Sequence, residues 1–337
     1  MVRSYLVLPS HSSLNSVSAS AISRFWFNLR VAAAVGTSPN KSKTMLTKTY
    51  SPARWWIKDA DQAVICQLCP RQCKIPLNRY GFCGVRKNLG GELLSLAYGY
   101  PVSIAIDPIE KKPLRKFLPG SKTFSFGTYG CNLNCCFCQN NTLSRGCYRL
   151  PAMPVWNTPA TMVDLARENG CSSLSYTYNE PTVFAEYASD IASLAHASGL
   201  KNVLVSNGYI STAAAADFYP LIDAANIDMK GFSEEFYQQQ CAASLAPVLA
   251  SIEKLYHLGK HLEITTLVIP GRNDSLAMFS QWLDWVEQHL DKDLPLHFSA
   301  YHPAHRCSAP PTPVKTLLNI RDLAWNRGFT AIYLGNI

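Results

Sequence analysis

The first 58 residues contain no aspartate or glutamate, although they carry eight lysines and arginines. The rest of the chain holds 23 basic and 23 acidic residues, so the net charge of +8 comes from this leading stretch alone. A body without charge bias does not indicate a nucleic-acid partner. The sequence also lacks an apolar run that would predict a membrane span, because Arg24 and Arg30 interrupt those of the leading stretch.

Residues 1–58 are rich in serine and bear arginine, a composition that resembles an organelle transit peptide. They lack the charged start, apolar centre and small-residue cleavage site of a secretory signal. Two other interpretations stay open, a disordered extension or a translation start at Met45. We expect a disordered leader over residues 1–58 and a cytoplasmic protein, or an organellar one if residues 1–44 are a transit peptide.

The twelve cysteines favour metal binding over disulfide formation. Disulfide frameworks are typical of small secreted domains, whereas eight of these cysteines lie in two tight groups of a 337-residue chain. This usage indicates a reducing compartment.

The stretch around which the chain is organised is 130–140, where Cys131, Cys135 and Cys138 have the spacing C-x3-C-x2-C. Three thiolates this close can ligate three irons of a cubane iron–sulfur cluster and leave the fourth iron open to a cofactor. Cys136 permits a second register through Cys131, Cys136 and Cys138, but adjacent side chains diverge, so Cys135 and Cys136 are not expected to share a cluster. The alternatives are a structural zinc loop or free cysteines, although zinc sites usually show two separated Cys/His pairs.

The other group is Cys66, Cys69, Cys73 and Cys83, spaced C-x2-C-x3-C-x9-C. Four thiolates suit a closed zinc site or a four-cysteine cluster, and the spacing does not decide between zinc and iron. Alternatively, this is a small cysteine-rich cap with buried, free thiols. Residues 107–113 follow, and their prolines and charges predict an exposed connector.

Strand and helix signals alternate from residue 122 onward. Thr158 as N-cap, Pro159 at the first helical position and Gly170 as a stop predict one helix, and a second is expected over residues 181–198. Strict alternation predicts a parallel sheet covered by helices, and six or seven units are too few for a closed barrel of eight. We therefore expect an α/β fold, a partial (β/α)6-type TIM barrel over 121–337, with a Cys-rich N-terminal extension over 59–120. Strands are expected at residues 122–129, 172–178, 202–205, 226–229, 262–269, 296–301 and 330–334.

Polar residues follow these strands, at the edge where barrel sites gather. Any one of them is explained equally well as a helix cap or turn residue. Their repetition at one rim favours a site. The stretches concerned are 176–181, 205–208, 228–231, 268–274 and 301–303.

These motifs resemble the radical S-adenosylmethionine (SAM) superfamily. Within it, the chain is similar to activases of glycyl-radical enzymes, such as pyruvate formate-lyase activating enzyme, and to the radical enzyme of the AmmeMemoRadiSam system. The similarity covers residue 59 to the end. Its matching stretches are 66–70, 81–86, 107–113, 130–140, 176–182, 228–230 and 335–336.

The resemblance implies a [4Fe–4S] cluster on Cys131, Cys135 and Cys138, which cleaves SAM reductively to a 5′-deoxyadenosyl radical. It implies five cofactor-binding residues. Phe137 stands before the last ligand, where the backbone meets the adenine, and Glu180 stands where the superfamily places the acceptor of the methionine amine. Asp228 and Lys230 match an Asp-x-Lys motif near the ribose and carboxylate, and His302 matches a Tyr-His pair that faces the cofactor. Tyr-Asn-Glu-Pro replaces the glycines that usually precede that glutamate.

The expected function is hydrogen abstraction that activates or modifies a partner, either a glycyl-radical protein or a Memo-like protein. The resemblance also implies an electron donor such as flavodoxin or ferredoxin. A different class stays open, a metal-stabilised binding module or iron–sulfur electron carrier without catalysis. Such a carrier would not need Glu180, Asp228 or Lys230. Zinc or an auxiliary iron–sulfur cluster is expected at Cys66–Cys83, and the second Cys-rich tail of the subgroup is not seen before Ile337.

Overall fold

The computed structural model describes residues 50–148 and 155–337. The leader expected over residues 1–58 therefore lies mostly outside the described residues. Its expected end at Lys58 was wrong, because residues 51–58 already form strands: β1 (Ser51–Pro52) pairs with β6 (Glu92–Ser95), and β2 (Trp56–Lys58) pairs with β3 (Val64–Cys66). Burial of neighbouring Ala53 fixes this segment against the body.

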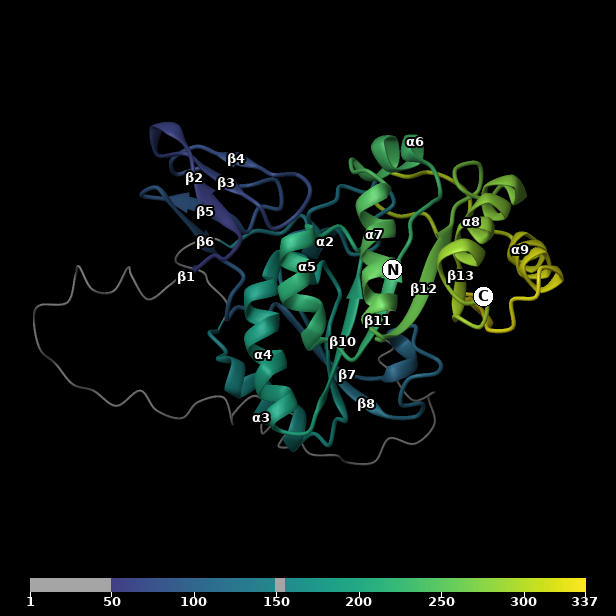
Figure 1. Ribbon diagram of the computed structural model, residues 1–337, viewed down its shortest axis with the longest axis horizontal. Helices are drawn as coiled ribbons and strands as arrows, with labels where there is room; N and C mark the ends of the chain where they lie inside the picture. Colours follow the sequence, from purple (N-terminus) through teal and green to yellow (C-terminus); the bar gives the residue numbers. More distant parts are fainter. Residues whose placement is uncertain (1–49, 149–154) are drawn as a thin grey trace, which may run out of the picture. The chain divides into compact units, whose positions relative to one another are not determined.

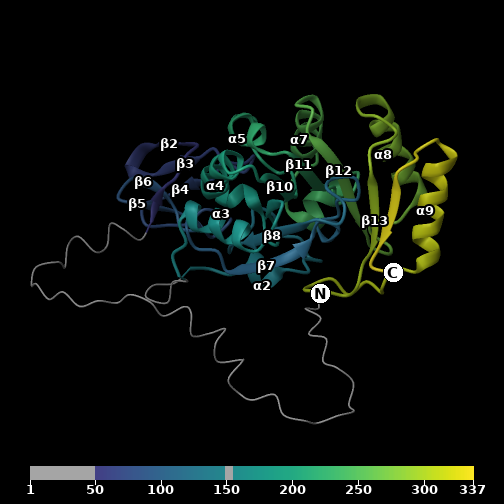
Figure 2. The same cartoon turned by 90° about the horizontal axis from the view of Figure 1, so that it is seen from below.

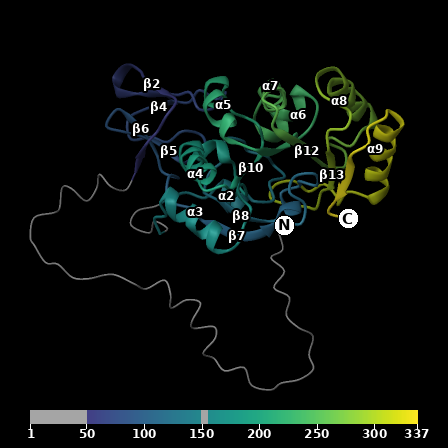
Figure 3. The same ribbon diagram turned by 60° about the horizontal axis from the view of Figure 1, so that its bottom comes forward.

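Two small antiparallel sheets build the cysteine-rich segment. One has the order β1-β6-β5, with β5 at Arg86–Leu89, and the other has the order β2-β3-β4, with β4 at Lys74–Ile75. Both lie beside helices α4 (Ala185–Ala197) and α5 (Thr212–Phe218) (Figures 1 and 3). The Trp55 indole N–H, for example, donates to Asp217 of α5 at 2.8 Å.

The third sheet has eight strands in the order β14-β13-β12-β11-β10-β9-β8-β7, and β8 to β14 are parallel. Because its order has two ends, the sheet is open, and the predicted partial barrel is confirmed. Helices cover its outer face (Figure 2). The strands are β7 (Ser103–Pro108), β8 (Lys122–Gly127), β9 (Ser173–Tyr176), β10 (Lys201–Ser206), β11 (Ala224–Asp228), β12 (His261–Val268), β13 (Leu296–Ala300) and β14 (Ile332–Gly335).

The helices begin and end where the local signals predict. In α3 (Pro159–Glu168) the Thr158 hydroxyl accepts from the Thr161 N–H, and Gly170 follows with a positive φ of 64°. The remaining helices are α2 (Asn141–Ser144), α6 (Glu234–Phe236), α7 (Ala246–His257), α8 (Leu276–His289) and α9 (Val314–Asn326). Short 3₁₀ segments, among them η4 (Pro181–Phe184), and the π-helical turn η6 (Tyr237–Cys241) complete the described part.

The expectation of an exposed connector at residues 107–113 was wrong. Asp107 belongs to β7, which pairs antiparallel with β8, and both Asp107 and Lys112 are buried. Farther on, Ile109 and Leu114 pack against Val203 of β10. The segment is buried because its charges find partners: the Lys112 ammonium donates to Asp107 at 2.6 Å. Composition alone cannot distinguish paired buried charges from solvated ones.

In the described ranges, none of the helices has the length and apolar character that crossing a bilayer requires.

Candidate active site

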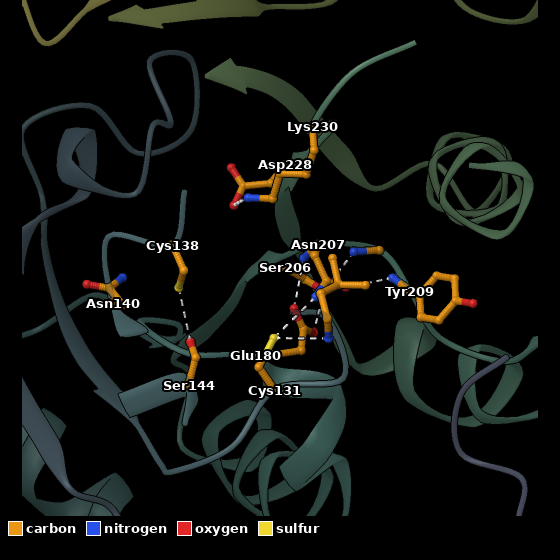
Figure 4. Close-up of polar contacts among 12 residues, drawn as sticks. Cys131, Cys138, Asn140, Ser144, Glu180, Ser206, Asn207, Tyr209, Asp228 and Lys230 are labelled. Carbon is orange, nitrogen blue, oxygen red and sulfur yellow. Dashed lines mark hydrogen bonds and ion pairs between the residues drawn. The ribbon is translucent and has the colours of Figure 1, made fainter. Parts of the chain in front are cut away.

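The predicted site residues follow the carboxyl ends of neighbouring strands. The cysteine loop follows β8, Glu180 follows β9 and Asn207 follows β10, whereas Asp228 ends β11 and Lys230 comes two residues later. Parallel strands present these ends at one edge of the sheet, so the structure brings the residues to one rim. Figure 4 shows Cys131, Cys138, Glu180, Asn207, Asp228 and Lys230 together.

The cysteine loop begins at a position that accepts only glycine. Gly130 has a positive φ of 91°, and a Cβ there would lie 2.6 Å from the Cys83 carbonyl oxygen. Farther along, two backbone hydrogen bonds attach the loop to η6, from Asn134 N–H to the Cys241 carbonyl and from Cys136 N–H to the Gln240 carbonyl, each at 2.9 Å. The loop is therefore held in a defined conformation at both ends.

The four sulfurs of this loop have different surroundings. The Cys131 sulfur accepts N–H groups from Leu133 at 3.4 Å and from the Asn207 amide at 3.8 Å. Cys138 contacts the Ser144 hydroxyl at 3.5 Å. The Cys136 thiol instead donates to the Gln240 side chain at 3.1 Å.

Cys131 and Cys136 also differ in the neighbours that shift their pKa values. Burial raises the pKa of Cys131, and the charges of Glu180, Cys135 and Cys138 raise it further. Cys136 responds to other neighbours: burial raises its pKa first, and Cys307 raises it next. The main charged neighbours of Cys136 are therefore not those of Cys131.

The donor set fits a [4Fe–4S] cluster. Thiolates that raise one another's pKa are stabilised by a cation bound among them, because metal binding replaces the thiol protons. The two N–H groups that point at Cys131 would stabilise its thiolate charge, and hydrogen bonds to the ligand sulfurs are among the features that tune cluster potential. Three cysteines able to bind three irons are therefore present in one loop, with Cys131 buried and Cys135 and Cys138 partly buried.

Glu180 is buried, and other groups of the protein donate hydrogen bonds to its carboxylate. One oxygen accepts from the Thr182 N–H at 2.9 Å and the Ser206 hydroxyl at 2.7 Å, and the other accepts from the Asn207 N–H at 2.9 Å. Burial raises the pKa of Glu180, and these hydrogen bonds oppose the rise. Glu180 thus connects the ends of β9 and β10, and its expected contact with the cofactor amine stays a prediction.

Asp228 and Lys230 form an ion pair of 2.7 Å beside Cys135. Burial lowers the pKa of Lys230, but the charges of Asp228 and Cys135 outweigh it, so the pKa is raised and the side chain stays cationic. The pKa of Cys135 is raised by its hydrogen bond with Cys241 and by burial, while Lys230 lowers it. This ion pair and Cys135 therefore form one electrostatic group.

The other two predicted cofactor residues differ in exposure. Phe137 is buried, and its ring lies 6.0 Å from that of Phe236. His302 is exposed in the loop after β13. The roles of both stay predictions.

Sequence reasoning assigned no role to Asn179 and Asn207. The Asn179 amide donates to the Gly130 carbonyl at 2.8 Å, and its carbonyl accepts the Thr128 N–H at 3.0 Å. Asn207 joins Glu180 to Cys131 through its backbone and side chain. Their positions in the turns after β9 and β10 were the sign in the sequence that could have indicated a role at the site, but an amide in a turn is common for other reasons.

Cys66, Cys69, Cys73 and Cys83 line one pocket, as a common metal site requires. Across residues 50–148 and 155–337, no three Cys, His, Asp or Glu side chains converge as the ligands of one ion would. The pocket also contains Asn132, so it borders the cysteine loop of the barrel.

Comparisons with known proteins show the family to which the chain is similar. The family described as Radical SAM superfamily matches residues 126–283, from β8 into α8. The “Uncharacterized protein MJ0808” of Methanocaldococcus jannaschii is 39% identical over 287 residues, which cover 85% of each chain. The “Benzylsuccinate synthase activating enzyme” of Thauera aromatica is 24% identical over 122 residues, covering 36% of this chain and 37% of that protein.

Among solved structures, a domain of pyruvate-formate lyase-activating enzyme from Bacteroides vulgatus has a TM-score of 0.43 and 13% identity, covering 49% of this chain and 99% of that one. The open parallel sheet with a three-cysteine loop after its first parallel strand defines a radical SAM enzyme. The chain belongs to the radical SAM superfamily. Membership implies a [4Fe–4S] cluster and SAM.

Proposed function

We propose that this radical SAM enzyme abstracts a hydrogen atom from a partner protein, as an activating or modifying enzyme. The similarity to benzylsuccinate synthase activating enzyme supports the activating role. The partner would be a glycyl-radical protein or a Memo-like protein, and the electron donor a flavodoxin or ferredoxin.

In this proposal, Cys131, Cys135 and Cys138 ligate the cluster. The observation that carries it is the position of the three cysteines in one loop after β8, at the rim where Glu180 follows β9 and Asp228 ends β11. When bound, the cluster supplies the electron that cleaves SAM into methionine and a 5′-deoxyadenosyl radical. The protein's own groups then have to bind the cofactor, orient it and exclude water.

The ion pair of Asp228 and Lys230 is suited to orienting the cofactor. Lys230 is 18% exposed, so its charge is accessible from the rim while Asp228 holds it at 2.7 Å. An ammonium in this position can bind the carboxylate of SAM, and Asp228 can accept from a ribose hydroxyl. The backbone beside Phe137 would meet the adenine of the same cofactor, His302 would face the cofactor, and Glu180 would receive its amine.

A non-catalytic electron carrier is the competing function. A carrier needs its cluster insulated and does not need a cationic side chain at an accessible rim. Lys230 is such a cationic side chain, paired with Asp228 at 2.7 Å and 18% exposed, and it therefore favours catalysis.

The test has two parts, one for cleavage of SAM and one for the partner protein, so that either proposal can fail without the other. Anaerobically reconstituted protein, reduced with dithionite, should convert SAM to 5′-deoxyadenosine, whereas a Cys131→Ala/Cys135→Ala/Cys138→Ala variant should not. Lys230→Ala should keep the cluster and slow cleavage, and Cys171→Ser, which alters a distant buried thiol, serves as the matched control. A fully loaded protein that cleaves no SAM would overturn the catalytic proposal.

The partner is tested with proteins encoded by neighbouring genes. Deuterated candidate protein should transfer deuterium into 5′-deoxyadenosine. Transfer from a small molecule and from none of the candidate proteins would overturn the partner assignment and leave the radical SAM activity standing.

A further inference from the structure

The pocket formed by the first cysteine group is compact and joins two parts of the fold. Cys66, Cys69, Cys73 and Cys83 reach it from β3, two turns and the approach to β5, and Val183 of η4 closes the barrel side. The pocket encloses about 310 Å³, including solvent at its mouth. Four cysteines from four chain positions thus line one pocket, and binding one ion would require their sulfurs to move closer together than they lie in the described residues.

Backbone N–H groups point at three of these sulfurs. Burial raises the pKa of Cys69 to about 12 and that of Cys83 to about 11, while N–H groups of Arg71 and Val85 respectively oppose the rise. Leu68 donates to Cys66 in the same way. Each donor lies two residues after its cysteine. Leu133 has the same relation to Cys131 in the cysteine loop at residues 130–140, called the radical loop from here on.

These N–H groups would stabilise the sulfurs as thiolates once a bound metal replaced the thiol protons. A hydrogen bond to the charged form stabilises that form, whereas a buried neutral thiol accepts only weakly. Such donors are a second shell of the kind that supports metal ligands.

Arg86 supplies a second, independent observation. Its side chain is 1% exposed and lines the pocket, and its Nε is buried without an acceptor among the described residues. An unpartnered guanidinium N–H in a buried site costs free energy unless an acceptor is bound there. Its charge lowers the pKa of both Cys66 and Cys83. The guanidinium is already paired with Glu186 at 2.8 Å, so what Arg86 offers to an anionic group is the unused N–H of its Nε.

We propose that Cys66, Cys69, Cys73 and Cys83 hold a second metal centre, thiolate-ligated and anionic, whose charge is stabilised by Arg86. Four thiolates around a dipositive centre leave a charge of about −2, whether that centre is Zn²⁺ or a [4Fe–4S] core. A zinc ion would draw the sulfurs to about 3.8 Å from one another, given a Zn–S bond of about 2.3 Å, whereas a cluster would fill a wider space.

If the metal is zinc, the centre is closed and its role is structural, whereas a four-cysteine cluster could also pass electrons. Four thiolates saturate a tetrahedral ion and leave no open position for chemistry. The site touches the radical loop directly: the Cys83 carbonyl lies against Gly130, and Arg71 Nε donates to the Asn132 carbonyl at 2.5 Å. It therefore supports the loop that carries Cys131 and would fix the N-terminal sheets against the barrel.

Metal analysis of the Cys131→Ala/Cys135→Ala/Cys138→Ala variant tests the proposal, because any remaining metal belongs to the second site. About one zinc, or about four irons with four sulfides, per chain supports the proposal and identifies the metal. Adding Cys69→Ser should remove it, whereas adding Cys171→Ser should not. A folded triple variant with neither metal would overturn the second site.

The protein that keeps Cys131, Cys135 and Cys138 provides a second measurement, in case the triple variant fails to fold. The loaded protein should contain about one zinc besides four irons, or about eight irons. Cys69→Ser should lower stability and remove only the second centre, and the remaining cluster should still change its electron paramagnetic resonance signal when SAM is added. Four irons and no zinc in the loaded protein would refute the proposal.

Discussion

Adjacent residues of the radical loop have different partners. Cys135 shares an environment with Lys230 and Cys241, whereas the Cys136 thiol donates to Gln240 and lies near Cys307. The backbone of the loop causes this, because its attachment to η6 turns the two side chains in different directions.

This difference predicts that substitutions of the four cysteines have unequal effects on the cluster. Cys131→Ala, Cys135→Ala or Cys138→Ala should each abolish the cluster, because each removes one of three ligands. Cys136→Ala should retain iron, sulfide and the brown absorption of reconstituted protein, and it should lose only a hydrogen bond. A normal cluster in Cys135→Ala together with loss in Cys136→Ala would mean that the register is Cys131, Cys136 and Cys138.

Among elements, helix α4 is joined to the N-terminal sheets by a buried ion pair. Arg86 donates to Glu186 at 2.8 Å, and the two side chains are 1% and 2% exposed. The Arg54 N–H donates to the same carboxylate oxygen at 2.8 Å. Breaking a buried pair leaves one charge without compensation.

Arg86→Met alone should therefore lower the free energy of unfolding by about 3–5 kcal/mol. Arg86→Met with Glu186→Leu should cost less than the sum of the two single changes. Urea unfolding with a metal chelator present measures the free energy of the Arg86–Glu186 pair without a contribution from the second metal site. Additive losses would show that the two side chains act independently.

Glu263 of β12 binds the backbone of the segment that follows β7 and η3 (Ile109–Lys111). Its carboxylate accepts the N–H groups of Arg115 and Lys116 at 2.8 and 2.9 Å and contacts His297 at 2.6 Å. Although burial raises the pKa of Glu263, hydrogen bonds from His261, His297 and these amides lower it to about 2.

Because the folded pKa lies below the ordinary value of 4.5, Glu263 stabilises the fold fully above pH 4.5. This contribution of about 3 kcal/mol declines as pH falls toward 2, with about 2 kcal/mol lost by pH 3. Unfolding free energies at pH 6 and pH 3 should therefore differ less in Glu263→Gln than in the unaltered protein. An equal pH dependence in both would contradict the assignment.

At the scale of the whole molecule, the residue at which a shortened chain begins decides which of its N-terminal contacts remain. The described part begins at Tyr50, and residues 51–58 supply β1, β2 and the hydrogen bond from Trp55 to Asp217. Residues before Met45 match no motif of the superfamily and contain no acidic partners.

A chain that begins at Met45 should keep the cluster content and SAM cleavage of the full chain. A chain that begins at Asp59 should lose solubility or several kcal/mol of stability, because it removes two strands and exposes the apolar surface they cover. Iron content, cleavage rate and thermal unfolding of both chains are the measurements. Loss of the cluster in the longer chain would make the leader part of the fold.

The sequence by itself determined the parallel sheet, its open order and the candidate ligands. Alternating strand and helix signals and the spacing of Cys131, Cys135 and Cys138 are properties of neighbouring residues, so local chemistry is sufficient to predict them. The same holds for Thr158 as a helix cap.

Only the tertiary structure decided which partners those residues meet. The burial of Asp107 and Lys112, the pairing of Arg86 with Glu186 and the bond from Asn207 to Cys131 join residues far apart in the chain. A charged or amide residue looks the same in sequence whether water or a buried partner satisfies it. Its environment is set by packing, and packing depends on how all strands of the sheet come together.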